Sequence, residues 1–283
     1  MINKGTVLVT GSSGFIGRAT VEKLQQAGWL VIKGVRPGGQ KQSNECVALD
    51  LTNPVGILDL VNKMHVDAIV HLGAHVGWSG ATESEMYCPN VLASGCVAFL
   101  AREWNANLIY ASAAIVCGSQ SERIGSDSPV APDLPYAYTK WLGELLVMAS
   151  QVRHCIFRIG GVFGRFGPSH LGLNRAIKGA LNGEMPFQIG MGRALRNYVY
   201  VKDVAAAITY ALENNLEGTH LLAGTEIISV NQMLKDICAR FFPGQRPIVQ
   251  AGPEAMSQII EPSPLLPKTR RFHEALIDIA GSC

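Results

Sequence analysis

Thr10-Gly11-Ser12-Ser13-Gly14-Phe15-Ile16-Gly17 is the stretch of sequence that decides the fold. An apolar run at residues 6–10 precedes it, and an amphipathic run at residues 15–27 follows it. The first run predicts a buried strand and the second a helix. The three glycines permit a tight turn with close backbone approach, and the start of the helix offers free N–H groups to an anion. This strand, turn and helix therefore predict a binding site for a dinucleotide pyrophosphate.

Short apolar runs alternate with longer amphipathic runs through the first 160 residues. We expect further strands at 29–35, 46–49, 68–72, 108–111 and 154–159, and helices at 54–64, 89–104 and 136–150. Strands alternating with helices are typical of a parallel sheet covered on both faces. The predicted fold class is α/β, a Rossmann-type doubly wound parallel sheet.

The pattern changes after Gly160, where glycine and proline become frequent and helical patterns such as 171–182 and 230–241 alternate with short strands. A helical pattern at 201–213 is expected to return to the main sheet. We therefore predict two domains. Residues 1–160 and 199–220 form the dinucleotide-binding domain, and residues 161–198 and 221–283 form a smaller, discontinuous C-terminal substrate lobe.

Composition excludes several classes of protein. The chain has 283 residues, 48% of them hydrophobic and 16% charged, with a net charge of +2. A disordered chain would be more polar, and a nucleic-acid-binding or membrane-surface protein more basic. The seven cysteines have no zinc spacing, the N-terminus has no signal-peptide pattern, and no apolar run is long enough for a membrane span. We expect a cytoplasmic protein that binds a small-molecule substrate.

Tyr136 and Lys140 form a Tyr-x-x-x-Lys pair at the start of the helix expected at 136–150. A spacing of four residues places both side chains on one face of a helix. A nearby ammonium stabilises a phenolate, so Lys140 would lower the pKa of Tyr136 and favour proton exchange with a substrate hydroxyl. Tyr138 lacks this spacing and is expected to be structural.

The glycine spacing and the Tyr136/Lys140 pair resemble the extended short-chain dehydrogenase/reductase family, which includes nucleotide-sugar epimerases and dehydratases. The resemblance extends over about residues 5–215 and includes Asp50-Leu51, His71-Leu72-Gly73-Ala74, Asn90 with Gly95, and the segment 157–164. It implies a catalytic tyrosine, a lysine that also holds the ribose, and a homodimer formed through the helices at 89–104 and 136–150. The expected cofactor-binding residues are Gly11, Ser13, Gly14, Phe15, Ile16, Gly17, Arg36, Asp50, Leu51, Leu72, Gly73, Ala74, Tyr136, Lys140 and Ile159.

The expected substrate-binding residues are His75, Ala113 and Arg196. The segment 196–204 resembles an Arg-aromatic-Val-Asp-Val block of the family, and the resemblance implies that Arg196 binds a substrate diphosphate through its guanidinium. The alternative for Arg196 is an ordinary ion pair. Ala113 stands where the family carries a catalytic serine or threonine, and alanine donates no hydrogen bond. The neighbouring Ser112 is the remaining hydroxyl, and we assign it a catalytic role although strand alternation would turn it away. Gly161 stands where many sugar-nucleotide members have asparagine. These departures favour an epimerase or reductase over a dehydratase.

The choice of cofactor depends on the residues after the second strand. NAD enzymes usually place an acid there to bind the ribose 2′-hydroxyl. This chain has Val35-Arg36-Pro37 instead, and Arg36, aided by Lys41, would bind a 2′-phosphate. We therefore predict NADP, with NAD as the alternative.

The same residues allow two other interpretations. His71 and His75 are four residues apart, but no further ligand completes a metal set, so no metal is expected. Because Ala113 removes a catalytic hydroxyl, the alternative function is a catalytically degenerate sensor of NADP(H) or a scaffold. The intact Tyr136/Lys140 pair favours the enzyme.

Overall fold

The computed structural model describes residues 4–38, 45–77 and 82–281. The chain divides into two compact units. Unit 1 contains residues 1–119, 130–158 and 204–220, and unit 2 contains residues 120–129, 159–203 and 221–283. Residues 120–129, which the sequence places in the nucleotide-binding domain, belong to unit 2 together with residues 199–203.

The first unit contains a seven-stranded sheet in the order β12-β7-β5-β4-β1-β2-β3. The strands are β1 (Thr6–Thr10), β2 (Leu30–Val35), β3 (Cys46–Ala48), β4 (Ala68–His71), β5 (Asn107–Ala113), β7 (His154–Ile159) and β12 (Gly218–Leu222). The pairs β1/β2, β1/β4, β2/β3 and β4/β5 are parallel. The strand order reverses between β1 and β4, and ligands of such sheets bind at the carboxyl ends beside this reversal.

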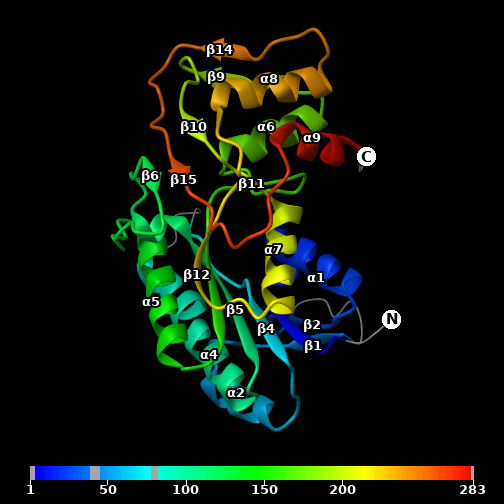
Figure 1. The fold of residues 1–283 in the computed structure, drawn as a ribbon, viewed down its shortest axis with the longest axis vertical. Helices are drawn as coiled ribbons and strands as arrows, with labels where there is room; N and C mark the ends of the chain where they lie inside the picture. Colours follow the sequence, from blue (N-terminus) through cyan, green and yellow to red (C-terminus); the bar gives the residue numbers. More distant parts are fainter. Residues whose placement is uncertain (1–3, 39–44, 78–81, 282–283) are drawn as a thin grey trace. The chain divides into compact units, whose positions relative to one another are not determined.

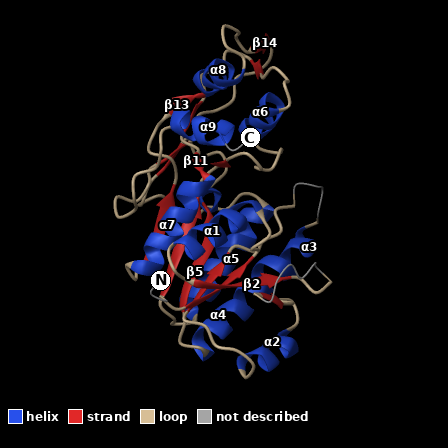
Figure 2. Cartoon of the chain, turned by 90° about the vertical axis from the view of Figure 1, so that its right-hand side faces the viewer, coloured by secondary structure: helices blue, strands red, loops and turns tan. Residues whose placement is uncertain are grey.

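Helices cover both faces of this sheet, which makes the fold a doubly wound Rossmann-type α/β fold. Figure 1 shows α4 and α5 side by side on one face and α1 and α7 on the other, and the strands are red in Figure 2. The helices are α1 (Phe15–Gln26), α2 (Pro54–Val61), α3 (Glu83–Tyr87), α4 (Ala93–Glu103), α5 (Pro135–Ala149) and α7 (Val201–Glu213), with a 3-10 turn at Ala114–Cys117. The main core packs between sheet and helices, with Leu8, Ile69, Leu100, Leu108 and Ile156 fully buried.

One expected helix differs from the structure. The sequence predicts a single helix over 89–104, whereas the chain forms α3, then a π-helical turn at Cys88–Leu92, then α4. Pro89 lies inside the turn and has no N–H to donate to an α-helical ladder. Isolated π turns of this kind occur frequently at functional sites.

The second unit contains short paired strands and three helices. The pairs are β6 (Arg123–Ile124) with β15 (Ile259–Ile260), β8 (Val162–Phe163) with β11 (Val199–Tyr200), β9 (Phe187–Ile189) with β14 (Ile248–Gln250), and β10 (Leu195–Arg196) with β13 (Ile228–Ser229). The helices are α6 (Gly172–Leu181), α8 (Val230–Phe241) and α9 (Phe272–Gly281), and α8 contacts the other two. Only β10/β13 is antiparallel among these four pairs.

Candidate active site

The glycine turn joins β1 to α1, and two of its glycines are required by geometry. Gly11 has a φ of 64°, a left-handed conformation that favours glycine. A Cβ on Gly17 would come closer than 3.0 Å to the carbonyl oxygen of Gly11. Gly14 caps α1 without a side-chain hydrogen bond, so the first N–H groups of the helix have no capping side chain. The turn therefore has the shape and the donors of an anion site.

The loop after β4 packs against this turn. A Cβ on Gly11 would lie 2.7 Å from the backbone nitrogen of Gly73. That nitrogen donates a hydrogen bond to Oγ1 of Thr10, at 3.3 Å. The structure thus brings the predicted cofactor segments 11–17 and 72–74 together at the carboxyl ends of β1 and β4.

His71 belongs to a buried polar cluster beneath the turn. Its Nδ1 lies 2.7 Å from Oγ1 of Thr10, and its Nε2 lies 3.5 Å from Oγ of Ser94. Burial, reinforced by the charge of Lys140, lowers the pKa of His71 to about 3. His71 is therefore a neutral structural group near neutral pH.

Tyr136 and Lys140 occupy the first two turns of α5. Lys140 is only 2% exposed, and its Nζ lies 4.2 Å from the centre of the Tyr110 ring. Within the described part of the chain its ammonium makes no hydrogen bond. A buried ammonium that is held only by an aromatic ring lacks the partners that such groups normally have. The hydrogen-bond donors of Lys140 are therefore not used by the described residues of the chain.

Burial dominates the ionisation of this pair. It raises the pKa of Tyr136, and the Lys140 charge opposes that rise while the Tyr110 phenol adds to it. Burial lowers the pKa of Lys140, whereas Tyr136 and the Glu144 carboxylate oppose this. In the structure, Lys140 limits a rise in the Tyr136 pKa that burial causes.

Ser112 and Ala113 are the last two residues of β5. Ser112 is 5% exposed, and its hydroxyl donates to Oε1 of Glu144 at 2.5 Å. Glu144 is fully buried and also accepts hydrogen bonds from Nη2 (2.8 Å) and Nε (3.1 Å) of Arg158. The hydroxyl proton of Ser112 is thus bound inside the protein, and only its lone pairs remain for a substrate.

Sequence reasoning missed this ion pair, although one signal was available. Glu144 lies one turn after Lys140 on α5, among residues that face the sheet. A carboxylate at a buried helical position nearly always has a charged partner. That rule predicts a partner for Glu144 but does not identify Arg158, which comes from β7.

Asn90 was part of the family resemblance, but the sequence did not assign it a contact in the site. It lies in the π-helical turn and is 1% exposed. Its amide accepts from the backbone N–H of His75 at 2.7 Å and donates to the His75 carbonyl at 2.8 Å. It also donates to Oγ1 of Thr139, which donates to the carbonyl of Tyr136 at 2.9 Å. One side chain therefore ties the loop after β4 to the first turn of the Tyr136 helix.

The remaining cofactor candidates of unit 1 lie at the ends of β2 and β3. Arg36 is exposed and directly follows β2. Asp50 is exposed, and its carboxylate accepts from the hydroxyl (2.6 Å) and N–H (2.9 Å) of Thr52, which lower its pKa. Leu51 is half-buried. Lys41 lies outside the described residues.

Three residues named from the sequence lie in unit 2. Ile159 is buried at the end of β7, two residues before Gly161. Nη1 of Arg196 donates to the carbonyls of Leu195 (2.9 Å) and Met256 (2.5 Å). The guanidinium is thus partly engaged within its own unit.

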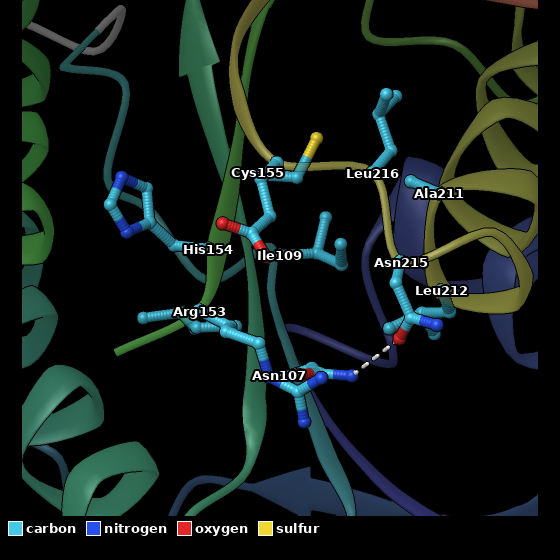
Figure 3. A pocket seen from close by; sticks show the side chains of 11 residues that line it. Asn107, Ile109, Arg153, His154, Cys155, Ala211, Leu212, Asn215 and Leu216 are labelled. Atoms are coloured by element: carbon cyan, nitrogen blue, oxygen red, sulfur yellow. Dashed lines mark hydrogen bonds between the residues drawn. The ribbon is translucent and has the colours of Figure 1, made fainter. Parts of the chain in front are cut away.

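The described residues contain no group of three or more His, Cys, Asp or Glu side chains that could hold a metal. Within the same residues, no helix is both long enough and apolar enough to cross a membrane. The hollow drawn in Figure 3 lies at the amino ends of β5 and β7, away from the glycine turn, and has a volume of about 10 Å³. It holds about one water molecule, so it is no site for a cofactor.

Known proteins resemble this chain over most of its length. Residues 7–224 match the model of the NAD dependent epimerase/dehydratase family. The dTDP-glucose 4,6-dehydratase of Mycolicibacterium smegmatis is 27% identical over 78% of this chain and 72% of the relative.

Two solved structures show the same fold. The UDP-N-acetylglucosamine 4-epimerase of Bacillus cereus has a TM-score of 0.84 at 24% identity and covers 98% of both chains. The dTDP-4-dehydrorhamnose reductase of Bacillus anthracis, solved in complex with NADP, has a TM-score of 0.80 at 20% identity and covers 99% of both chains.

Proposed function

Since this chain is an enzyme that belongs to the NAD dependent epimerase/dehydratase family, we propose that it is an epimerase or reductase of nucleotide sugars that uses Tyr136 as its acid–base group. The observation that carries this proposal is the Lys140 ammonium, which is 2% exposed and lacks a hydrogen bond among the described residues. Such a group is costly to bury unless a ligand completes it. A ribose hydroxyl supplies the missing oxygen.

The residues present fit a nicotinamide dinucleotide at two separate points. The Gly11–Gly17 turn leaves no room for side chains at Gly11 and Gly17, and it presents uncapped N–H groups to a pyrophosphate. At the second point, the Lys140 ammonium can donate a hydrogen bond to a ribose hydroxyl. Gly73 and Ala74 lie beside the turn, where we propose that they line the cofactor.

The nicotinamide supplies reversible hydride transfer when it is bound. The chain supplies the proton chemistry. Tyr136 accepts the proton of a substrate hydroxyl as hydride leaves the carbon, and returns it when hydride comes back. Lys140 favours the phenolate form, and Asn90 holds the first turn of α5 through Thr139. Because Ala113 donates nothing and the Ser112 hydroxyl donates its hydrogen bond to Glu144, Tyr136 carries the proton transfer, with Ser112 contributing as an acceptor.

For the cofactor we propose NADP, with Arg36 on the 2′-phosphate. Arg36 directly follows β2 and is exposed, and no acid stands at the end of that strand to bind a ribose 2′-hydroxyl. The family's name refers to NAD, so the proposal of NADP for this chain depends on Arg36. A guanidinium binds phosphate oxygens in a bidentate manner.

One experiment tests both proposals. Nucleotide released from the purified protein is identified by mass spectrometry, and the emptied protein is then titrated with NADPH and NADH. We expect binding of NADPH at least about tenfold tighter than NADH, one charge-assisted contact being worth about 1.4 kcal/mol or more, and loss of the difference in Arg36→Ala. Equal affinities contradict the NADP proposal, and binding of neither contradicts the enzymatic one.

The second candidate function is a degenerate sensor or scaffold, which Ala113 favours. A turnover assay distinguishes the two functions. The substrates to test are UDP-glucose, UDP-N-acetylglucosamine, UDP-glucuronate and dTDP-glucose. An enzyme converts at least one of these in the presence of cofactor. A sensor binds the cofactor and converts none.

A further inference from the structure

Tyr110 is the aromatic residue whose ring lies against the Lys140 ammonium. It belongs to β5 and has no exposed surface, and the centre of its ring is 4.2 Å from Nζ of Lys140. A cation over an aromatic ring is attracted by the ring quadrupole, and the attraction is strongest where water is excluded. The ring therefore holds the ammonium without using any of its three N–H donors.

Contacts from α4, α5 and β4 fix the Tyr110 side chain. Its hydroxyl donates to the carbonyl of Lys140 at 3.4 Å and lies 3.3 Å from Oγ of Ser94. Its ring stacks on that of His71, with 5.7 Å between the ring centres. A Cβ on Gly143 would come closer than 3.0 Å to the Tyr110 hydroxyl oxygen. Glycine weakens the interior of a helix, so its presence within α5 is explained by the room that the phenol needs.

The two stacked rings are both neutral near neutral pH. Burial raises the pKa of Tyr110, and burial together with the Lys140 charge lowers the pKa of His71 to about 3. A phenolate at position 110 would form an ion pair with the ammonium and compete with a ligand oxygen for its donors. The neutral ring attracts the charge without this competition.

Two titratable groups on α5 also act on the ammonium. Tyr136 and Glu144 both oppose the lowering of the Lys140 pKa by burial. The Glu144 carboxylate accepts hydrogen bonds from Arg158 and Ser112. It therefore acts on Lys140 through its charge, since Lys140 makes no hydrogen bond to it or to any other residue that the structure describes.

We propose that Tyr110 is a positioning residue, whose ring holds the Lys140 ammonium so that its three N–H donors remain available to a ribose hydroxyl and to the Tyr136 phenolate. The proposal rests on the function proposed above. Tyr110 acts through Lys140 and does not touch the substrate. A buried charge is costly without a partner, and the ring supplies that partner before the cofactor binds.

The test measures the titration of Lys140 directly, by NMR of protein labelled at its lysine side chains. The Lys140 signal is assigned by its absence in Lys140→Met. Tyr110→Phe keeps the ring and Tyr110→Leu removes it, and both lose the hydroxyl, so their comparison isolates the ring. We expect the pKa of Lys140 to be about one unit lower in Tyr110→Leu, because the ring stabilises the charged form. NADPH should bind about tenfold more weakly to Tyr110→Leu than to Tyr110→Phe.

Phe157→Leu is the matched control. It removes another ring with no exposed surface from the same sheet, one that packs beside His220. This variant should lose stability but keep the wild-type titration of Lys140. If Tyr110→Leu does not fold, pentafluorophenylalanine at position 110 serves as the second variant, because fluorine withdraws electrons from the face of a ring of similar size. It should lower the pKa of Lys140 in the same direction.

Equal pKa values of Lys140 in Tyr110→Phe and in the variant without an electron-rich ring overturn the assignment. A change of the same size in Phe157→Leu also overturns it, since the effect would then come from packing. Neither result depends on turnover. The proposed function fails on a different measurement, a wild-type protein that binds cofactor and converts no nucleotide sugar, and the titration of Lys140 still decides the role of the ring in that case.

Discussion

The amino ends and the carboxyl ends of the strands in the seven-stranded sheet differ in which of their polar groups lack a hydrogen-bond partner. The amino ends have a groove of about 640 Å³ beside Trp29 and Trp104. Two of its charged groups have partners, since Lys4 pairs with Glu213 and the Asp67 carboxylate accepts from the backbone of Thr6. The buried atoms there that lack a hydrogen bond among the described residues, Nε1 of Trp29 and Oδ1 of Asn107, are uncharged. The carboxyl ends have glycines that a neighbouring backbone crowds and a buried ammonium without a hydrogen bond. The difference teaches that a buried charge without a hydrogen bond is a stronger indication of a ligand site than empty volume.

The strongest test of the difference between the two ends is to remove the proposed acid–base group, Tyr136. Tyr136→Phe should lower kcat about 1,000-fold, the usual scale of acid–base catalysis, and leave cofactor affinity unchanged. Tyr138→Phe is the matched control, because Tyr138 lies on the same helix and is 51% exposed. Steady-state kinetics and a nucleotide titration give the result. Normal turnover in Tyr136→Phe would show that the proton is handled elsewhere.

A smaller effect is expected from the buried ion pair. Glu144→Gln keeps the shape of the side chain but leaves Arg158 without a counter-charge, so the free energy of unfolding should fall by about 3 kcal/mol. Glu213→Gln, at the amino ends, breaks an exposed pair and should cost less than about 1 kcal/mol. Urea denaturation compares the two variants. Equal losses would remove the energetic distinction between the pairs.

The smallest of the three effects concerns the glycine turn. Gly17→Ala places a methyl group against the Gly11 carbonyl and should cost about 2 kcal/mol of stability, together with measurable loss of nucleotide affinity. Gly172→Ala is the control, since a Cβ there meets no atom within 4 Å. Calorimetry and a cofactor titration test both. Unchanged nucleotide affinity in Gly17→Ala would show that the glycine turn does not contribute to cofactor binding.

The sequence predicted the parts of this molecule that have short-range signals. Strands β1 and β7 occupy the residues expected, and α5 begins within one residue of the prediction. These elements could be predicted because the spacing of apolar residues depends only on residues close in sequence. The glycine turn and the Tyr136/Lys140 pair were likewise found from spacing. Their roles toward cofactor and substrate stay predictions.

The supporting contacts could not be predicted in the same way. Asn90 and Thr139 are 49 residues apart, and Ser112 and Glu144 are 32 apart, so only the folded sheet brings them together. The π-helical turn that carries Asn90 was missed because a 3.6-residue pattern fits it nearly as well. The direction of the Ser112 hydroxyl also depends on a partner from another element.

The π-helical turn at Cys88–Leu92 limits how this gene segment can change in length. Each residue of an α-helix rotates the chain by about 100°. A π turn holds one more residue than an α turn, so deleting Val91 or Leu92, which lie between Asn90 and α4, should restore a regular helix and rotate Asn90 relative to α4. The amide would then lose His75 and Thr139 together. The contacts of Asn90 therefore depend on the number of residues in this turn as well as on their identity.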